Sequence, residues 1–410
     1  MHLFAFEGLR YTGPPAEAGE LAAPPYDQID DAARARFQAA SPHQFVHLTR
    51  PVPADGLDMY RHAAAVHSRW LASGVTARDP RPALYPYVIE LAGGGRRLGV
   101  CGLVGLDDPR IIRPHEQTLD KPLADRLALL RATRVDLEPI LLLSEDGGRL
   151  DALLGEDLAG AKALADHRDA DGNHHRLYRV EDPAHIADYK RLLDGHPSAI
   201  ADGHHRYKVA QRFAGETGAA PGTAAAAKLA VVTSLASPAL TIDPIHRALK
   251  ERVDLGRIAN LAAARSPWEG SGGAALATAV AAAPQPALGI WVAGERPEIW
   301  RLEPASAPAT LPPGARDLTV LLLHEAIFPA LGLGPAAATD GTALYRSDPE
   351  VLWGMVAAGE AGTGFWLPPM QPAAFAAAIA QGDMLPPKST RFLPKVMSGL
   401  VWADHASRLL

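Results

Sequence analysis

The residues best suited to chemistry lie in one stretch, Ala199–Tyr207, which reads Ala-Ile-Ala-Asp-Gly-His-His-Arg-Tyr. The apolar residues before Asp202 predict a short strand, and those after Gly203 predict the start of a helix. The first turn of that helix would hold three cation-capable side chains, His204, His205 and Arg206. Because the helix dipole already places partial positive charge there, an anion is the natural partner. Phosphate is favoured, since glycine lets a ligand approach the N–H groups of the turn.

A plainer interpretation of this stretch stays open. Asp202 would simply be the N-cap of the helix, and the histidines would be solvated.

The second informative segment, Arg113–Thr118, reads Arg-Pro-His-Glu-Gln-Thr. Pro114 keeps the residue before it extended, so His115 and Glu116 should follow a strand and precede a helix that begins near Pro122. The carboxylate of Glu116 is suited to binding Mg²⁺ or accepting a proton, and the alternative is that it caps the following helix.

Together the two segments have what phosphoryl transfer needs. Cations and N–H groups neutralise the transferring phosphoryl group, and a carboxylate orients or deprotonates the acceptor hydroxyl. We therefore take Glu116 and Asp202 as candidate catalytic residues and candidate Mg²⁺ ligands. His115 and Thr118 are candidate substrate-binding residues.

Two further basic segments are candidates to close on the same site. One follows Pro244, and the other is the stretch Leu385–Lys395, whose alternative interpretation is a solvent-exposed tail stiffened by prolines. Its Lys-Ser-Thr run resembles the end of a Walker A loop, but the upstream glycines are absent. The candidate phosphate- and nucleotide-binding residues are Gly203, His204, His205, Arg206, His246, Arg247, Lys388, Ser389, Thr390 and Lys395.

The elements that must position these residues alternate between helix and strand, which predicts an α/β (α+β) chain. Hydrophobic spacing predicts helices over 58–73 and 184–193, a hairpin over 84–92 and 96–106, and strands at 139–143, 177–180 and 228–235. From about Val253 the sequence becomes rich in alanine. We expect a catalytic core over 1–250 with an insertion at about 144–198, an α/β C-terminal domain over 251–385, and a basic C-terminal strap over 386–410.

Composition excludes several classes of function. The net charge of -6 and a pI near 6.2 give no global attraction to nucleic acid or to an anionic membrane. The single cysteine, Cys101, excludes an intramolecular disulfide and a multi-thiolate zinc site, and its apolar surroundings predict a buried thiol. The N-terminus lacks a signal-peptide layout and no apolar run is long enough to span a membrane, so we expect a soluble cytoplasmic protein. A Gly-x-Ser-x-Gly elbow, a His-x-x-x-His metal motif and a dinucleotide fingerprint are all missing.

The sequence resembles the bacterial and archaeal family catalogued as domain of unknown function 1015, whose name supplies no reaction. The pieces that carry the resemblance are Ala23–Asp27, Pro114–Thr118, Asp125–Leu127, Ala201–Tyr207, Pro244–Arg247 and Pro387–Lys395.

More distantly, the order of His115-Glu116, a helix, the 139–143 strand and the Asp202–Arg206 turn is similar to the ParB/sulfiredoxin superfamily and its free-serine kinases. That resemblance implies a nucleotide-binding core in which Glu116 and Asp202 are catalytic and the His-His-Arg run holds phosphate. Sulfiredoxin chemistry does not fit, because His204 stands where the catalytic cysteine would be. DNA binding is disfavoured by the acidic charge balance and by the lack of a helix-turn-helix.

The leading hypothesis is a small-molecule phosphotransferase similar to a free-serine kinase. It would use ATP or ADP with Mg²⁺ and a small hydroxyl-bearing metabolite, of which serine is one candidate. Two alternatives remain open. Water would attack a phosphomonoester such as phosphoserine, or nucleotide binding would regulate the protein without turnover.

Overall fold

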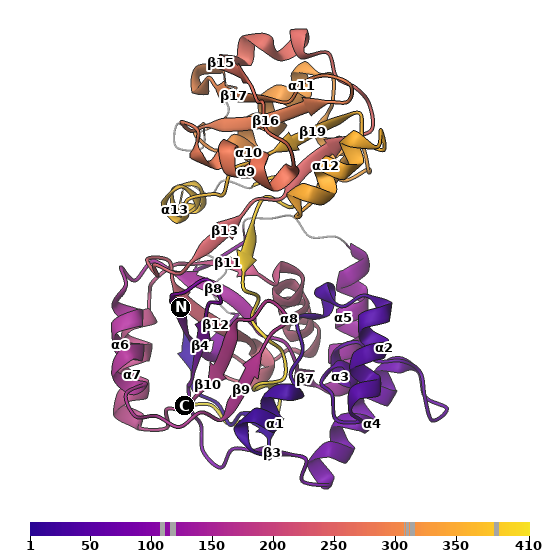
Figure 1. The fold of residues 1–410 in the computed structure, drawn as a ribbon. Helices are drawn as coiled ribbons and strands as arrows, with labels where there is room; N and C mark the ends of the chain where they lie inside the picture. The colour runs from indigo at the N-terminus through magenta and orange to yellow at the C-terminus, as the bar shows by residue number, and fades with distance from the viewer. Residues whose placement is uncertain (107–110, 115–119, 307, 309–310, 312–315, 381–384) are drawn as a thin grey trace. The chain divides into compact units, whose positions relative to one another are not determined.

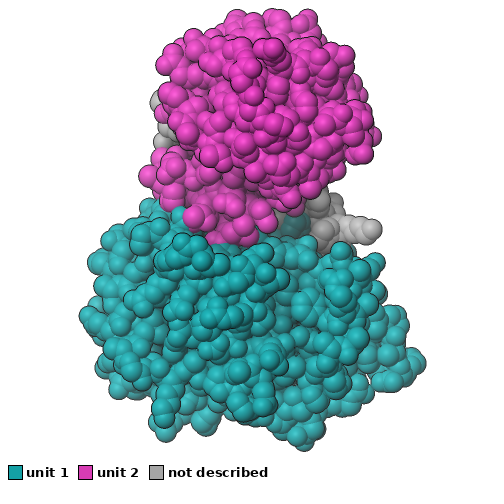
Figure 2. Space-filling view, in the orientation of Figure 1, with its two compact units in different colours: residues 1–114, 118–240, 394–410 teal, residues 115–117, 241–393 magenta. Residues whose placement is uncertain are grey.

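A computed structural model describes residues 1–106, 111–114, 120–306, 308, 311, 316–380 and 385–410. The chain divides into two compact units, drawn in different colours in Figure 2. Unit 1 comprises residues 1–114, 118–240 and 394–410, and unit 2 comprises residues 241–393. These bounds differ from the predicted limits at 250 and 385, and the predicted strap contributes residues to both units.

Unit 1 is built on a mixed β-sheet with the strand order β6-β11-β8-β12-β5-β4-β10-β9, in which β1 also pairs with β5. Strand β12 runs parallel to β8 and antiparallel to β5, and β11 runs antiparallel to β8. Every residue of β12 is buried, as expected for a central strand covered on both faces. The strands are β1 (Leu3–Phe4), β4 (Tyr85–Glu90), β5 (Arg96–Gly105), β6 (Ile112–Arg113), β8 (Ile140–Ser144), β9 (Ala165–Arg168), β10 (His174–Leu177), β11 (Ser198–Asp202) and β12 (Ala227–Ser234).

Helices cover both faces of this sheet (Figure 1). Helices α6 (Arg149–Asp157) and α7 (Pro183–Leu193) pack on one face and share a core with the inward side chains of β4, β5, β8 and β12. Helix α8 (His204–Thr217) packs on the other face, with α5 (Asp120–Thr133) beside it and α4 (Met59–Ala72) beyond. The remaining helices are α1 (Pro15–Glu20), α2 (Asp31–Ala40) and α3 (Val46–Thr49).

Most predicted elements of unit 1 are confirmed. The 58–73 helix is α4, and the Asp58 side chain caps it by accepting from the N–H groups of Tyr60 and Arg61. The hairpin, the 139–143 strand, the 184–193 helix and the strand-to-helix turn at 202 are all present. Cys101 is 1% exposed, as predicted.

The predicted strand at 177–180 is wrong by three residues at both ends, since the observed strand spans 174–177. The strand is β10, in which His175 and Leu177 point inward while His174 and Arg176 are partly exposed. A histidine occupies one of the inward positions, so the alternation of apolar residues that identifies a strand was hidden. Together with β9, this strand places the predicted insertion at the edge of the main sheet.

The last residues of the chain belong to the core of unit 1. Trp402 is 0% exposed and exchanges two backbone hydrogen bonds with Leu9, of 2.8 and 3.0 Å. Strand β21 (Ala403–Asp404) pairs with β7 (Val135–Asp136), and β2 (Leu9–Tyr11) pairs with β3 (Thr76–Arg78). Residues 394–410 are therefore built into unit 1 rather than forming a tail.

Unit 2 contains an antiparallel sheet with the order β15-β17-β16-β19-β14-β18 and a separate ribbon of β13 with β20. Helices α9 and α12 pack on the sheet around Trp366, which is fully buried. The strands are β13 (Thr241–Asp243), β14 (His246–Leu249), β15 (Ala262–Pro267), β16 (Ala287–Val292), β17 (Glu298–Leu302), β18 (Ala343–Arg346), β19 (Thr363–Trp366) and β20 (Arg391–Leu393). The helices are α9 (Gly273–Ala282), α10 (Thr319–Leu322), α11 (Phe328–Ala330), α12 (Pro349–Ala357) and α13 (Pro372–Ala380).

Both units mix helices and strands, so the predicted α/β class is confirmed. Within the described ranges, no helix has the length and apolar character needed to cross a membrane.

Candidate functional site

The turn between β11 and α8 has the geometry expected of an anion-binding helix start. Gly203 is the N-cap, with φ of 95°, and the first intrahelical hydrogen bond runs from the N–H of Tyr207 to its carbonyl, at 2.9 Å. The amides before Tyr207 lie where a helix offers no internal acceptor. A Cβ added at Gly203 would lie 2.6 Å from Cγ2 of Ile140, so the position requires glycine for space as well as for φ.

The alternative in which Asp202 caps the helix is wrong. The N-cap is Gly203, which provides no side-chain cap for the helix. The carboxylate of Asp202 is engaged elsewhere: Oδ2 accepts from Nη2 of Arg206 at 2.5 Å, and Oδ1 accepts from Nζ of Lys395.

These contacts fix the charge of Asp202. Burial alone would raise its pKa, but the nearby charges of Lys395 and Arg206 outweigh burial and lower the pKa to about 2. Asp202 is therefore ionised at neutral pH and is a weak proton acceptor.

Arg206 points into the protein from the first turn of α8. Its side chain is 6% exposed, and Nη1 donates to the carbonyl of Pro139 while Nη2 binds Asp202. Its guanidinium is thus arranged to hold the turn against the start of β8.

The other side chains of this helix start differ in exposure. His204 is 9% exposed, and burial lowers its pKa to about 4, so the ring is neutral at pH 7. His205 is half-buried, and Lys208, which was not singled out from the sequence, is exposed on the second turn.

Lys395 reaches this turn from the C-terminal segment, nearly two hundred residues away in sequence. Its side chain is 17% exposed, and its ammonium lies against Asp202. The structure therefore brings together six of the predicted residues within unit 1, namely Asp202, Gly203, His204, His205, Arg206 and Lys395.

Glu138 is a buried residue of this region that the sequence reasoning missed. It is 5% exposed, and Oε1 accepts from the N–H of Tyr26 at 2.9 Å and from the hydroxyl of Ser398 at 3.4 Å. Burial raises its pKa, and the charges of Arg206 and Arg126 oppose that rise. No sequence motif contains Glu138, so only the three-dimensional structure reveals it.

Tyr26 and Arg126 were also missed as site residues, although both lie in segments that carry the family resemblance. The guanidinium of Arg126 stacks on the ring of Tyr26, 4.2 Å from its centroid, and donates to the carbonyl of Thr49 at 2.7 Å. Nη1 of Arg126 lies 3.8 Å from Oε2 of Glu138. The family segments 23–27 and 125–127 therefore meet at Glu138. The signal that the sequence offered for Tyr26 and Arg126 was their place in segments that carry the family resemblance.

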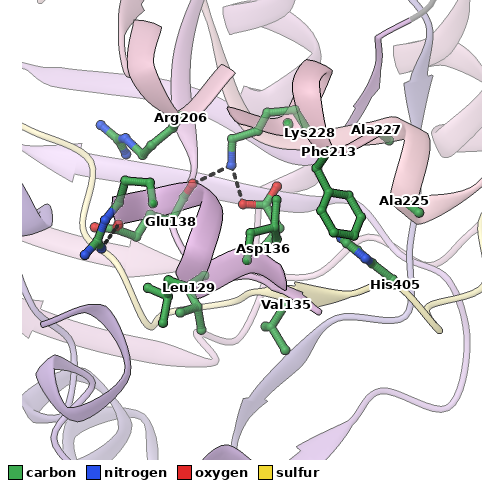
Figure 3. Close-up of a pocket in the computed structure, with 14 residues that line it drawn as sticks. Leu129, Val135, Asp136, Glu138, Arg206, Phe213, Ala225, Ala227, Lys228 and His405 are labelled. Atoms are coloured by element: carbon green, nitrogen blue, oxygen red, sulfur yellow. Dashed lines mark hydrogen bonds and ion pairs between the residues drawn. The ribbon is translucent and has the colours of Figure 1, made fainter. Parts of the chain in front are cut away.

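A cavity of about 50 Å³ lies beside this cluster and is drawn in Figure 3. The ammonium of Lys228 lies between the carboxylate of Asp136 and the carbonyl of Glu138, which it approaches to 2.8 Å. The volume suits one or a few water molecules and is far below that of a nucleotide. We therefore place the candidate ligand site at the start of α8 and not in this cavity.

The remaining predicted residues lie in unit 2 or outside the described residues. In unit 2, His246 is 1% exposed and its Nδ1 accepts from the N–H of Leu367, at 3.1 Å. Arg247 is fully buried, and its Nε donates to His324 at 3.2 Å. The other three, Lys388, Ser389 and Thr390, belong to unit 2 as well, whereas His115, Glu116 and Thr118 lie outside the described residues.

The described residues do not by themselves fit a Mg²⁺ ion. No group of three or more His, Cys, Asp or Glu side chains within them is arranged to hold a metal. Both oxygens of Asp202 already accept from cations, so a metal ion there would share the carboxylate with Lys395 and Arg206.

Comparison with known proteins gives a family and a set of distant folds. The model of the family described as protein of unknown function (DUF1015) matches residues 3–271. The comparison with curated proteins gave no significant match.

Solved structures similar to the chain include a conserved hypothetical protein from Pyrococcus furiosus, at 13% identity and a TM-score of 0.36, covering 74% of this chain and 93% of that one. A free serine kinase in complex with AMP is 15% identical with a TM-score of 0.35, covering 74% and 90%. SbnI with a C-terminal truncation, from Staphylococcus aureus, is 12% identical with a TM-score of 0.35, covering 72% and 85%. At these scores the likeness is one of distant fold.

Proposed function

Since the chain belongs to the DUF1015 family, whose description names no function, we propose its activity from the residues of unit 1. The proposal is a small-molecule phosphotransferase that moves a phosphoryl group from ATP or ADP to the hydroxyl of a small metabolite.

The observation that carries the proposal is the juxtaposition of Asp202 and Lys395 at the start of α8. Outward N–H groups, an αL glycine and a lysine ammonium together suit the terminal phosphate of a nucleotide. The side chains of His205, which is half-buried, and Lys208, which is exposed, lie on the first two turns of the same helix. In this proposal the incoming phosphate shares Lys395 with Asp202, and the low pKa of Asp202 keeps the carboxylate charged while it does so.

The roles of the residues follow from their contacts. Arg206 holds the turn to the carbonyl of Pro139 and acts as a positioning residue. Lys395 and the helix amides neutralise charge on the transferring group. Asp202 is too weak a base to keep a proton, so the proposal assigns proton acceptance to Glu116, which the sequence places before α5.

The proposed phosphoryl transfer is a displacement at phosphorus. The acceptor oxygen attacks the terminal phosphorus of the nucleotide, and the bond from that phosphorus to its bridging oxygen breaks. The nucleotide leaves with one phosphate fewer. The hydroxyl proton passes to the carboxylate of Glu116 and then to solvent.

The experiment is a transfer assay with purified protein, ATP or ADP, Mg²⁺ and serine, which is the acceptor named by the resemblance to free-serine kinases. Mass spectrometry should detect phosphoserine and one equivalent of ADP or AMP, respectively. The Lys395→Ala variant should be impaired, and Lys162→Ala, which changes an exposed lysine of the same unit, should not be.

Absence of any phosphorylated product with serine and with a panel of hydroxyl metabolites would overturn the proposal. Release of phosphate from phosphoserine in the absence of nucleotide would identify a hydrolase instead.

A further inference from the structure

The backbone around Lys395 is held on both sides by buried side chains. The carbonyl of Pro394 accepts from Nη2 of Arg97 at 2.6 Å, and the N–H of Met397 donates to the hydroxyl oxygen of Tyr87 at 3.2 Å. Beyond them, Ser398 exchanges two backbone hydrogen bonds with Ala23, of 2.8 and 3.0 Å. The residues on either side of Lys395 are therefore fixed to β4 and β5.

Tyr87 is itself held by a chain of hydrogen bonds that ends in a carboxylate. Its hydroxyl lies 2.6 Å from Nδ1 of His175, and Nε2 of His175 lies 3.0 Å from Oδ2 of Asp169. Tyr87 is 2% exposed and His175 is 0% exposed, so both groups are shielded from bulk solvent.

The hydrogen-bond directions in this chain are determined by chemistry. Burial lowers the pKa of His175 to about 4, so the ring is neutral and carries one proton. A carboxylate accepts only, which places that proton on Nε2 and leaves Nδ1 to accept from the hydroxyl of Tyr87. The phenol oxygen then has a lone pair directed to the N–H of Met397.

The carboxylate at the end of the chain is immobilised by its own loop. Asp169 accepts from the N–H of Asp171 at 3.0 Å and from the backbone and side-chain nitrogens of Asn173, both at 2.8 Å. This loop joins β9 to β10 and lies within the predicted insertion at 144–198. The insertion thus contributes the polar side chains of Asp169 and His175, which are linked through Tyr87 to the backbone of the C-terminal segment.

We infer that these contacts serve to position Lys395. Asp169, His175 and Tyr87 form one clamp, on the backbone N–H of Met397, and Arg97 forms the other, on the carbonyl of Pro394. These four are positioning residues, which act on the ligand only through Lys395. The inference rests on the proposed function of Lys395 and Asp202, and it assigns the insertion a part in positioning Lys395. A buried chain of this kind is costly to assemble unless every member is satisfied, and here each group has its partner.

The test compares Tyr87→Phe with Tyr189→Phe in the full-length protein. Tyr189 is a matched control because it is a fully buried tyrosine of the same unit, and its hydroxyl donates to Asp157 at 2.7 Å. Pulsed acetylation with mass spectrometry measures the reactivity of Lys395 relative to the exposed Lys162. Loss of one buried hydrogen bond on the clamp should raise the relative acetylation rate of Lys395 by about tenfold in Tyr87→Phe. Tyr189→Phe should leave that rate within about twofold of the wild-type rate.

Each variant is measured below its own melting temperature, and Asp169→Asn serves as a second change, which acts on Tyr87 through His175 and should also raise the rate. An unchanged Lys395 rate in Tyr87→Phe, or an equal rise in both tyrosine variants, would overturn the inference. Because acetylation reports the position of Lys395 directly, the result stands even if the protein transfers no phosphate. If it does bind nucleotide, Tyr87→Phe should weaken that binding and Tyr189→Phe should not.

Discussion

At the scale of single residues, the site depends on how Asp202 is charged. The carboxylate is largely buried, which costs energy, and it persists as an anion because two cations lie against it. Removing Lys395 or Arg206 would therefore alter the ion pair between Asp202 and the other cation, as well as the binding of the ligand.

Lys395→Ala should weaken nucleotide binding by about 10- to 100-fold, since a hydrogen bond to a charged group contributes about 1.5–3 kcal/mol. Calorimetric titration with ADP gives the affinity, and Lys162→Ala is the matched control. An affinity within about twofold of wild type would remove Lys395 from the ligand site.

The low pKa of Asp202 also has a consequence for acid stability. The folded pKa of about 2 lies below the unfolded value of about 3.9, so the stabilisation is present above pH 4 and is lost as pH falls toward 2. Asp202→Asn should be less stable than wild type at pH 7, because Lys395 and Arg206 lose their carboxylate. The difference should shrink by on the order of 2 kcal/mol between about pH 5 and about pH 2.5, as measured by urea unfolding. A difference that stays constant over that range would show that Asp202 is not held ionised by these cations.

Residue types and spacing predicted the strand-to-helix turn at 202–206, and they led to the proposal that it binds an anion, because the reasons are local: a glycine, a helix start and unbalanced positive charge. They did not reveal Glu138 or Arg97, which lie in or next to strands and acquire their roles from segments distant in sequence. Arg206 was predicted as a phosphate ligand from its place in the first turn, and its inward contacts depend on the carbonyl of Pro139, which no local pattern encodes.

At the scale of elements, the junction of β11 and α8 depends on one glycine. Gly203→Ala should be more destabilising than Gly218→Ala, although both glycines flank α8 with positive φ. A Cβ at Gly203 would clash with Ile140, whereas nothing lies within 4 Å of a Cβ at Gly218. The difference in free energy of unfolding should be about 1–3 kcal/mol, the usual cost of overpacking. Equal losses in urea unfolding would mean that the junction tolerates a side chain.

The spacing of apolar residues predicted α4 and α7, and two mainly apolar runs separated by three glycines predicted the β4–β5 hairpin, since each of these signals lies within the element's own sequence. Strand β10 was misplaced because a fully buried histidine occupies an inward position. The same histidine is the centre of the clamp on Met397, so the residue that hid the strand is one with a proposed role.

At the scale of the whole molecule, the chain leaves unit 1 and returns to it through an antiparallel ribbon. Thr241 pairs with Leu393 across β13 and β20, which places their Cα atoms about 5 Å apart. Deleting 241–393 and joining Leu240 to Pro394 through two glycines should leave a cooperatively folding unit 1.

Thermal unfolding followed by circular dichroism provides the measurement. The shortened protein should melt in one transition, and a version that also lacks 394–410 should not, because the buried Trp402 would be lost. Absence of a transition in the first protein would mean that unit 1 needs unit 2 to fold. The domain limits were predicted from the change in composition near Val253. They could not show that residues 394–410 belong to unit 1, because no sequence pattern indicates the pairing of Leu9 with Trp402.

The central claim is that the start of α8 binds the phosphates of a nucleotide, and calorimetric titration with ADP, ATP and adenosine tests it most directly. We predict that ADP and ATP bind with one site per chain and at least about 100-fold more tightly than adenosine, because two charge-assisted contacts are lost without phosphate. The tighter binding should weaken as salt is added. Adenosine that binds as well as ADP, or a protein that binds none of the three, would contradict the account.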